Sequence, residues 1–304
     1  MKEIDVSIIL LTLNAGEKFK KVLKAVFNQT YNNFEVIIID SSSIDNTLEY
    51  AKRYPLKIFK ISRIDFGHGK TRNLGASLAR GRYLVYLTQD AIPVDNNWLT
   101  NLLVNLKIEN VAGVFGKQIP NMTANPLDFF NYKEYYPDIK KNISIQNYKQ
   151  NNVIFSDTNS AVKKLVMLKY PYPENVLLSE DLGWAIGIIK KNYKIIYEPT
   201  AAVIHSHKFS LINNIKLNFD QGVAFSQIYQ KENSTYVMSN NKRRSINKIK
   251  YLVKNYKYHW ILISFAIDTI NFLSTALGKN YRKLPVFLLK RLSNYPNYWG
   301  KYVK

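Results

Sequence analysis

Hydrophobic residues in the first third of the chain follow two different periods. Two mainly apolar runs, Val6 to Leu13 and Phe34 to Ile39, end at the polar residues Asn14 and Asp40. Short apolar runs bounded by turn residues are typical of buried strands. Between the two runs, apolar positions recur every three or four residues, which predicts a helix with one buried face. These positions are Phe19, Val22, Leu23, Val26 and Phe27.

The same alternation continues as far as Asp90. We expect a helix starting near Asp45, a short strand over residues 57–61, a helix from Lys70 to Ala79 and a strand over residues 83–90. Strands that alternate with helices through short loops favour a parallel sheet covered by helices on both faces. The predicted fold class is therefore α/β, with a ligand crevice at the carboxyl ends of the strands.

The middle of the chain is less regular. Residues 121–152 are rich in Asn, Tyr and Pro, which predicts an irregular and partly mobile insertion. A strand is expected over residues 111–116, and regular order should return at residues 153–155 and 160–162. A helix is expected over residues 181–191, then a strand near 195–197, followed by the stretch 201–207. No internal repeat or long low-complexity segment is apparent.

Positive charge is concentrated at the C-terminal end of the chain. The formal net charge is +21, and residues 241–304 hold 14 Lys or Arg against a single acid, Asp268. Residues 1–120 carry a net charge of only +5, and residues 121–240 one of +3. A block this basic attracts polyanions, either nucleic acid or an anionic membrane surface. We therefore predict a main domain over residues 1–240 and a basic, aromatic-rich helical tail over residues 241–304.

The tail contains one long apolar segment, from Trp260 to Leu277. It includes Asp268, Asn271 and several Ser or Thr residues. A spanning helix needs about 20 mainly apolar residues, and a central Asp costs roughly 2.5–3.5 kcal/mol on insertion scales. We therefore predict a helix that lies in the headgroup region of a membrane, or a helical hairpin packed on the main domain, and these two arrangements are compatible.

Two absences narrow the class of protein. The chain has no cysteine, so a disulfide framework and a thiolate metal site are both excluded. The first residues lack the long apolar core and the cleavage site of a signal peptide, so we expect the protein to stay in the cytoplasm.

Carboxylates stand at two of the predicted strand tips. Asp90 ends the run that begins at Tyr83, and Pro93 follows it closely. A lone carboxylate at such a tip commonly holds a hard divalent metal ion against phosphate oxygens, whereas the simpler alternative is an aspartate that starts a turn. Asp40 ends the second strand, where it can accept hydrogen bonds from a nucleotide base or a ribose. Asp45 is better explained as a cap of the following helix.

The segment Phe66 to Asn73 combines two glycines with basic residues. The glycines allow close backbone approach, while Lys70 and Arg72 can face a phosphate or a base carbonyl. The pattern is neither a P-loop nor a dinucleotide fingerprint, so by itself it indicates little.

Two further clusters could serve catalysis or metal binding. Glu180 and Asp181 open a predicted helix, where acids are favoured by the helix dipole alone, although one of them could face a cleft as a general base. His205 and His207 alternate along an extended segment, which puts both imidazoles on the same side. They are either a solvated pair or partners of Asp90 at a metal ion.

Taken in order, these motifs resemble the family 2 glycosyltransferases, which have a GT-A fold, and more narrowly the bacterial rhamnosyltransferase branch. The match covers about residues 4–230 and is looser in the basic tail. Many family members carry Asp-x-Asp at the metal site, whereas this chain has Gln89-Asp90-Ala91, so a histidine and the diphosphate would complete the metal shell. The matching stretches are residues 66–73, 88–93, 116–120, 155–161 and 197–207.

The resemblance implies a Rossmann-like, mostly parallel sheet and a role for each matching residue. The donor nucleotide would contact Thr12, Asn14, Asp40, Arg72, Asn73 and Gln89. A Mg²⁺ or Mn²⁺ ion that bridges the donor diphosphate would meet Asp90 and His205 or His207. Asp181 would be the catalytic base, and the acceptor and sugar side would be shaped by His68, Glu180 and Trp184.

The resemblance also implies a reaction. We expect an inverting transfer of a sugar, L-rhamnose from dTDP-L-rhamnose, to a hydroxyl of a lipid-linked or growing cell-surface polysaccharide. A UDP-hexose is the alternative donor. The basic tail would hold the enzyme as a peripheral protein at the inner face of the plasma membrane, where such acceptors reside.

Two other classes of protein were compared with this interpretation. A nucleic-acid-binding protein would suit the net charge, but that charge lies in the tail, and strand-tip carboxylates repel phosphates in the absence of a metal ion. No nucleic acid is therefore expected as a partner. A nucleotidyltransferase would need a glycine-rich basic loop after the first strand, where this chain has only Asn14-Ala15-Gly16-Glu17.

Overall fold

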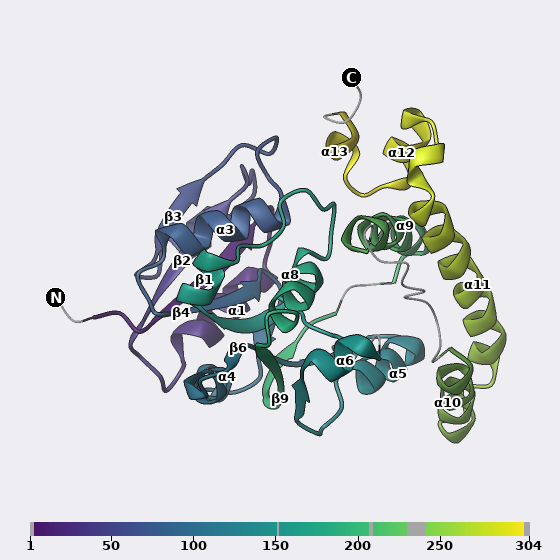
Figure 1. Cartoon of the computed structure of the whole chain (residues 1–304), viewed down its shortest axis with the longest axis horizontal. Coiled ribbons are helices and arrows are strands. Elements are labelled where there is room, and N and C mark those ends of the chain that lie inside the picture. The colour runs from purple at the N-terminus through teal and green to yellow at the C-terminus, as the bar shows by residue number, and fades with distance from the viewer. Residues whose placement is uncertain (1–2, 151, 207–208, 230–240, 301–304) are drawn as a thin grey trace. The chain divides into compact units, whose positions relative to one another are not determined.

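The chain forms two compact units in the computed structural model, which describes residues 3–150, 152–206, 209–229 and 241–300 (Figure 1). The first unit comprises Met1–Asn121, Tyr136–Glu174 and Glu180–Ser206, and the second comprises Met122–Tyr135, Asn175–Ser179 and His207–Lys304. The predicted domain boundary at residue 240 falls outside the described residues, so the division into 1–240 and 241–304 stays a prediction.

The first unit begins with the predicted alternation of strands and helices. Four strands run parallel: β1 (Val6–Thr12), β2 (Phe34–Asp40), β3 (Lys57–Lys60) and β4 (Tyr83–Thr88). The helices between them are α1 (Lys18–Phe27), α2 (Thr47–Ala51) and α3 (His68–Leu78). Thr12 pairs with Asp40 in the register of β1 and β2, so the polar ends of these strands lie side by side.

Further strands extend the sheet beyond β4. They are β5 (Ile92–Pro93), β6 (Val111–Ile119), β7 (Lys141–Ile143), β8 (Asn159–Lys163) and β9 (Lys194–Ile204). The strand order is β3-β2-β1-β4-β8-β6-β9-β5, and β7 pairs with β9. Because β8 runs antiparallel to both β4 and β6, β6 and the parallel β9 point in the same direction as the first four strands. The predicted sheet is confirmed as mostly parallel, with antiparallel strands that the sequence pattern did not distinguish.

Helices cover both faces of this sheet. Ile8 and Leu10 share a core cluster with the buried side chains of α1 and α4 (Trp98–Val104). Ile9, between them, points to the other face, where α3 lies. A Cβ added to Gly75 of α3 would lie 2.6 Å from Ile9 Cγ2, so glycine lets the helix approach the strand closely. The remaining helices of this unit are η1 (Asn105–Lys107), α6 (Ile145–Lys149), α7 (Lys164–Lys169) and α8 (Glu180–Ile189).

Residues 121–152 are more regular than their composition indicates. They contain α5 (Pro126–Tyr135), β7 and α6, so the prediction of an irregular insertion was wrong. Asn125 supports the start of α5, because its Oδ1 accepts the backbone N–H of Leu127 at 2.9 Å and of Asp128 at 3.0 Å. The described residues 152–156 make no sheet pairing, although Val153 and Phe155 are buried.

The second unit is helical, as predicted for the tail. Its helices are α5, α9 (Leu211–Ile228), α10 (Asn241–Lys254), α11 (His259–Lys279), η2 (Tyr281–Lys283), α12 (Val286–Leu292) and α13 (Pro296–Gly300). A small core joins Leu177, Phe219, Val223, Leu289 and Trp299. Among the described residues, α11 is the one helix long and apolar enough to cross a membrane by length and composition.

Candidate active site

The tips of β1 and β2 hold a buried carboxylate. Asp40 is fully buried, and its Oδ1 accepts the Thr12 hydroxyl at 2.9 Å. The backbone N–H of Ser43 donates to Asp40 Oδ2 at 2.9 Å, and the Ser43 hydroxyl donates to Oδ1 at 2.5 Å. The structure therefore brings Thr12 and Asp40 together, as predicted for one pocket, and fixes the orientation of the carboxylate.

Two amide side chains organise the loop that follows β1. The Gln89 amide bonds the backbone of Leu13 at two points, accepting its N–H at 2.8 Å and donating to its carbonyl at 3.2 Å. Asn14 has a φ of 47° and accepts the N–H of Ile44 at 2.9 Å. Glutamine at position 89 thus ties the loop after β4 to the tip of β1. Contact of Asn14 and Gln89 with a nucleotide stays a prediction.

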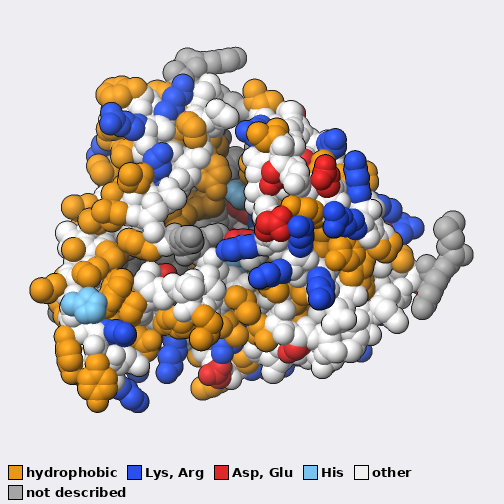
Figure 2. All heavy atoms as spheres, turned by 180° about the vertical axis from the view of Figure 1, so that it is seen from behind, with side chains coloured by type: hydrophobic (Ala, Val, Ile, Leu, Met, Phe, Trp, Pro, Cys, Tyr) orange, Lys and Arg blue, Asp and Glu red, His pale blue; other side chains and the backbone are white. Residues whose placement is uncertain are grey.

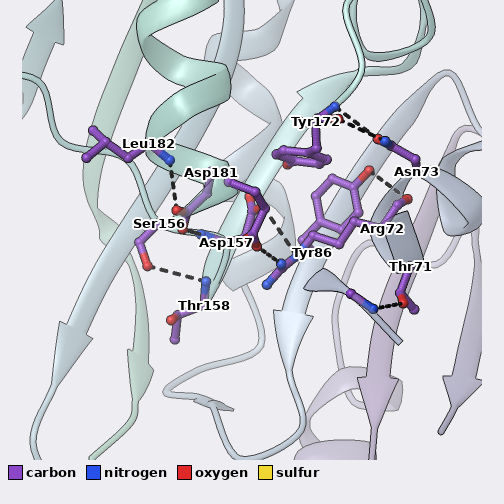
Figure 3. Close-up of polar contacts among 12 residues, drawn as sticks. Thr71, Arg72, Asn73, Tyr86, Ser156, Asp157, Thr158, Tyr172, Asp181 and Leu182 are labelled. Carbon is purple, nitrogen blue, oxygen red and sulfur yellow. Dashed lines mark hydrogen bonds and ion pairs between the residues drawn. The ribbon is translucent and has the colours of Figure 1, made fainter. Parts of the chain in front are cut away.

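An ionic cluster lies where α3 meets the start of α8 (Figure 3). The Arg72 guanidinium forms an ion pair with Glu180, and its Nε lies 3.3 Å from Asp157 Oδ2. All three side chains are buried, and Arg72 and Glu180 are 108 residues apart in sequence. The carboxylates hold the pKa of Arg72 above its ordinary value despite its burial, so the guanidinium stays charged. Arg72 is thus committed to acidic partners, and its predicted contact with a nucleotide base stays a prediction.

Asp181 is held beside this cluster by two backbone groups. Its Oδ2 accepts the N–H of Asp157 at 3.1 Å, and its Oδ1 accepts the N–H of Leu182 at 2.8 Å (Figure 3). Burial, followed by the charge of Glu180, raises the pKa of Asp181 to about 6. Burial likewise raises the pKa of Asp157 to about 6. Because the two carboxyls interact, they titrate as a pair, and a proton is exchangeable here near neutral pH.

Asp90 and His205 approach each other at the end of the sheet. His205 Nε2 lies 3.5 Å from Asp90 Oδ1, while His205 Nδ1 lies 2.9 Å from Gln118 Oε1. Because an amide oxygen only accepts, Nδ1 of His205 donates to Gln118, and this contact turns Nε2 toward Asp90. A carboxylate and an imidazole placed in this way suit a divalent ion that takes its other ligands from a diphosphate.

The protein supplies only part of a metal shell at this place. Among the described residues, no group of three or more His, Asp or Glu could hold a metal ion. The prediction for His207 lies outside the described residues. The geometry therefore fits an ion that is bound together with its diphosphate, in agreement with the single carboxylate of Gln89-Asp90-Ala91.

Three other predicted site residues have surroundings that the structure defines. Trp184 is buried, and its Nε1 donates to the carbonyl of Tyr170 at 2.8 Å. Asn73 accepts the N–H of Tyr172 at 3.0 Å and donates back to its carbonyl at 3.0 Å. Burial, with the positive charge of Arg72, lowers the pKa of His68 to about 3, so this ring is neutral at physiological pH. These contacts shape the walls of the site, and direct contact with donor or acceptor stays a prediction.

Sequence reasoning missed two residues of the site, Asp157 and Gln118. Both lie in stretches that carried the family resemblance, but neither was assigned a role. Asp157 carries a recognisable signal, since Asp-Thr-Asn-Ser leads directly into the buried strand β8, and its Oδ1 accepts the hydroxyl of Ser160 at 2.6 Å. Gln118 lies inside a strand, where only the structure reveals that it contacts His205.

Comparison with known proteins agrees with this geometry. Residues 7–170 match the model of glycosyl transferase family 2. The chain is 32% identical to the O-antigen chain rhamnosyltransferase RfbN of Salmonella typhimurium over 98% of its own length and 96% of the relative's. It is 34% identical to the O-antigen chain rhamnosyltransferase WbaN of Salmonella anatum, over 97% and 95% of the two chains.

A solved structure supports the fold. The mannosyltransferase PcManGT from Pyrobaculum calidifontis, in complex with GDP-Man and Mn²⁺, superposes with a TM-score of 0.64 at 16% identity, covering 92% of this chain and 88% of that one. The GT-A-like fold predicted from the motifs is thereby confirmed. Together with the match over residues 7–170, these relatives show that the chain belongs to glycosyl transferase family 2.

Proposed function

We propose that this glycosyltransferase moves L-rhamnose from dTDP-L-rhamnose to a hydroxyl of a lipid-linked or growing cell-surface polysaccharide, with inversion at the anomeric carbon. The observation that carries the proposal is the Asp181 carboxylate, which two backbone N–H groups orient and whose pKa lies close to neutral pH. The two Salmonella relatives, which are named as O-antigen chain rhamnosyltransferases, support the choice of sugar.

The reaction needs one proton acceptor and no enzymic nucleophile. Asp181 takes the proton of the acceptor hydroxyl as that oxygen forms a bond to the anomeric carbon. The bond between the anomeric carbon and the diphosphate oxygen breaks on the opposite face, and dTDP leaves with the electron pair. A single displacement of this kind inverts the anomeric configuration.

A divalent ion would be held by Asp90 and His205. When bound, Mg²⁺ or Mn²⁺ neutralises negative charge on the diphosphate of the leaving group. This chain would contribute two metal ligands, Asp90 and His205, and Gln118 orients the ring of His205. Asp40 and Thr12, together with Asn14, would line the pocket of the nucleotide.

Arg72 fits a different role from that of a base contact. Its guanidinium lies between Asp157 and Glu180, so we propose that it positions the acidic cluster around Asp181 and supports the nucleotide pocket only indirectly. Asn73 and Gln89 would act similarly, because their amides hold the backbone of Tyr172 and Leu13.

The donor assignment has a direct test. Purified full-length protein, supplied with dTDP-L-rhamnose and Mg²⁺ or Mn²⁺, is expected to release dTDP, and the release should depend on the added metal ion. UDP-glucose and UDP-galactose are the control donors. Turnover of a UDP-hexose without turnover of dTDP-L-rhamnose would replace the donor while leaving sugar transfer in place. Failure with every nucleotide-sugar, acceptor glycan included, would contradict the proposal as a whole.

The rate of transfer should depend on pH through the acidic cluster. Asp181 must be ionised to accept a proton, so the rate is expected to fall about tenfold per pH unit below a pH of about 6. Glu180→Gln removes a negative charge that raises the pKa of Asp181. The acidic limb of the rate profile, in which the rate falls as the pH falls, should therefore move to lower pH. The measurement is the initial rate from pH 5 to 8 at saturating donor. Glu109→Gln, which changes an exposed carboxylate away from the site, should leave the pH dependence in place, and an unchanged pH dependence in Glu180→Gln would argue against Asp181 as the base.

We also infer that the enzyme works as a peripheral protein at the cytoplasmic face of the membrane. Residues 241–304 hold 14 basic residues against one acid, and a lipid-linked acceptor would be presented at that surface.

A further inference from the structure

The exposed side of α11 carries several large apolar side chains, whereas its buried positions are small residues. Ser264, Ser274 and Gly278 are buried on one side of the helix. The opposite side presents Leu262, Phe265, Phe272, Leu273 and Leu277, each at least 45% exposed. A surface helix of a soluble domain normally has the reverse arrangement, with apolar residues against the core.

The inward face of α11 is committed to α9. Asn271 Oδ1 accepts the amide of Asn218 at 3.1 Å. A Cβ added to Gly278 would lie 2.0 Å from the carbonyl oxygen of Phe219, so the two backbones touch at this point. Helices that meet through small residues and amide hydrogen bonds are typical of lipid surroundings. The inward contacts fix the rotation of α11, so the apolar face, from here on Leu262, Phe265, Phe272, Leu273 and Leu277, stays turned away from α9.

Basic residues far outnumber acidic ones in the segment that carries this apolar face. Asp268 is the sole acid of residues 241–304, and both of its oxygens accept from Lys248 of α10, at 2.6 and 2.7 Å. Exposed basic residues precede and follow the helix, namely Lys250, Lys254, Lys257, Arg282 and Lys283. Figure 2 shows the result on the side formed by α10 and α11, at the left of the view, where Lys and Arg side chains lie among hydrophobic ones.

We propose that the apolar face of α11 docks flat on an anionic phospholipid surface. The large side chains enter the boundary between headgroups and acyl chains, while the flanking Lys and Arg contact lipid phosphates. A spanning orientation is disfavoured because Asn271 and Asp268 of α11 are engaged by Asn218 of α9 and Lys248 of α10, which puts polar and charged groups along the helix. The inference deepens the proposed function, on which it rests for the lipid-linked nature of the acceptor, by naming the surface that holds the enzyme there.

Vesicle binding by the full chain tests this surface. The protein is expected to float with vesicles of equal parts phosphatidylglycerol and phosphatidylcholine, and much less with phosphatidylcholine alone or at high salt. Leu262→Gln/Phe265→Gln should weaken the partition coefficient at least about tenfold, since two apolar contacts are lost. Arg282→Glu/Lys283→Glu should remove the preference for phosphatidylglycerol.

A matched control comes from α7 of the first unit. Leu165 and Leu168 are 82% and 51% exposed, against 78% and 51% for Leu262 and Phe265, so Leu165→Gln/Leu168→Gln changes two apolar side chains of similar fractional exposure. This control should bind vesicles as the parent does. If Leu262→Gln/Phe265→Gln lowers the melting temperature, Phe272→Gln/Leu273→Gln tests the same face two turns further along the helix.

Three outcomes would overturn the docking surface. The parent protein does not bind anionic vesicles, or all apolar-face variants bind as well as the parent. The third outcome is that the parent is a dimer and that the apolar-face variants are monomers. Turnover of dTDP-L-rhamnose in solution is measured in parallel. Vesicle binding without turnover would contradict the proposed donor and leave the docking surface standing, whereas turnover without vesicle binding would do the opposite.

Discussion

Asp181→Asn is expected to lower the rate of sugar transfer by about 10²–10⁴-fold while donor binding stays close to that of the parent. The amide has the shape of the carboxylate but cannot take a proton from the acceptor hydroxyl. One of its two polar atoms still accepts a backbone N–H, from either Asp157 or Leu182, so the start of α8 should stay in place. Single-turnover rates and dTDP binding by calorimetry measure the two effects separately.

The stability of this variant has a predictable direction. Because burial raises the pKa of Asp181, the folded state binds a proton more tightly than the unfolded state. That contribution to stability is fully present below the ordinary pKa near 4 and is lost as the pH rises through about 6. At pH 7.5 the charge therefore opposes folding, and its removal offsets the lost hydrogen bond. Asp95→Asn, at an exposed carboxylate, is the control, and a transfer rate above a tenth of the parent's in Asp181→Asn would exclude the base assignment.

The strands and helices of the first half of the fold could be predicted because the local pattern of apolar residues there matches their burial in the folded protein. In β1 and β2 both faces of the strand are buried, so a mainly apolar run is enough to identify each strand. The polar residue that ends each run, such as Asp40, marks the tip where ligands bind. Thr12 and Asp40 could be placed together from sequence because parallel neighbouring strands put their carboxyl ends at one edge.

The sequence pattern does not show which strands and side chains distant in the chain contact each other. Nothing local distinguishes β8 as antiparallel, because its direction is set by its neighbours β4 and β6. Val153 and Phe155 alternate like a strand, yet both are buried by packing alone. Likewise, an arginine in a glycine-rich segment indicates an anion, but the sequence does not say whether the anion is a phosphate or Glu180.

The orientation of α11 was equally hidden. Its composition predicted a helix that lies on a membrane or packs on the protein. The hydropathy of the segment does not show that Asn271 points inward and Phe272 outward. Only the contacts with α9 separate a polar, small-residue face from an apolar one. The physical reason is that rotation about the helix axis is decided by packing, not by composition.

Arg72→Met is expected to cost about 3–5 kcal/mol in the free energy of unfolding, because it leaves Glu180 and Asp157 buried without a positive partner. Arg72→Lys should recover part of this loss, since one ammonium group supplies the charge but cannot reach two carboxylates with the planar geometry of a guanidinium. Chemical denaturation of the full chain measures both variants. Arg80→Met is the control, because the Arg80 side chain is exposed and its buried partner Glu35 keeps a second ion pair with Lys57, so a smaller loss is expected.

The same variants separate a positioning role for Arg72 from a contact with the nucleotide. If Arg72 orders the acidic cluster, Arg72→Met/Glu180→Gln should be more stable than Arg72→Met, because it removes one of the stranded charges. The acidic limb of the rate profile should move to higher pH in Arg72→Lys if its ammonium group lies farther from Asp181, since the positive charge of Arg72 lowers the pKa of that carboxyl. A contact with the base predicts the contrary pattern, in which Arg72→Met unfolds like the parent and loses affinity for dTDP. Denaturation midpoints and dTDP affinities, measured on the same preparations, decide between the two roles.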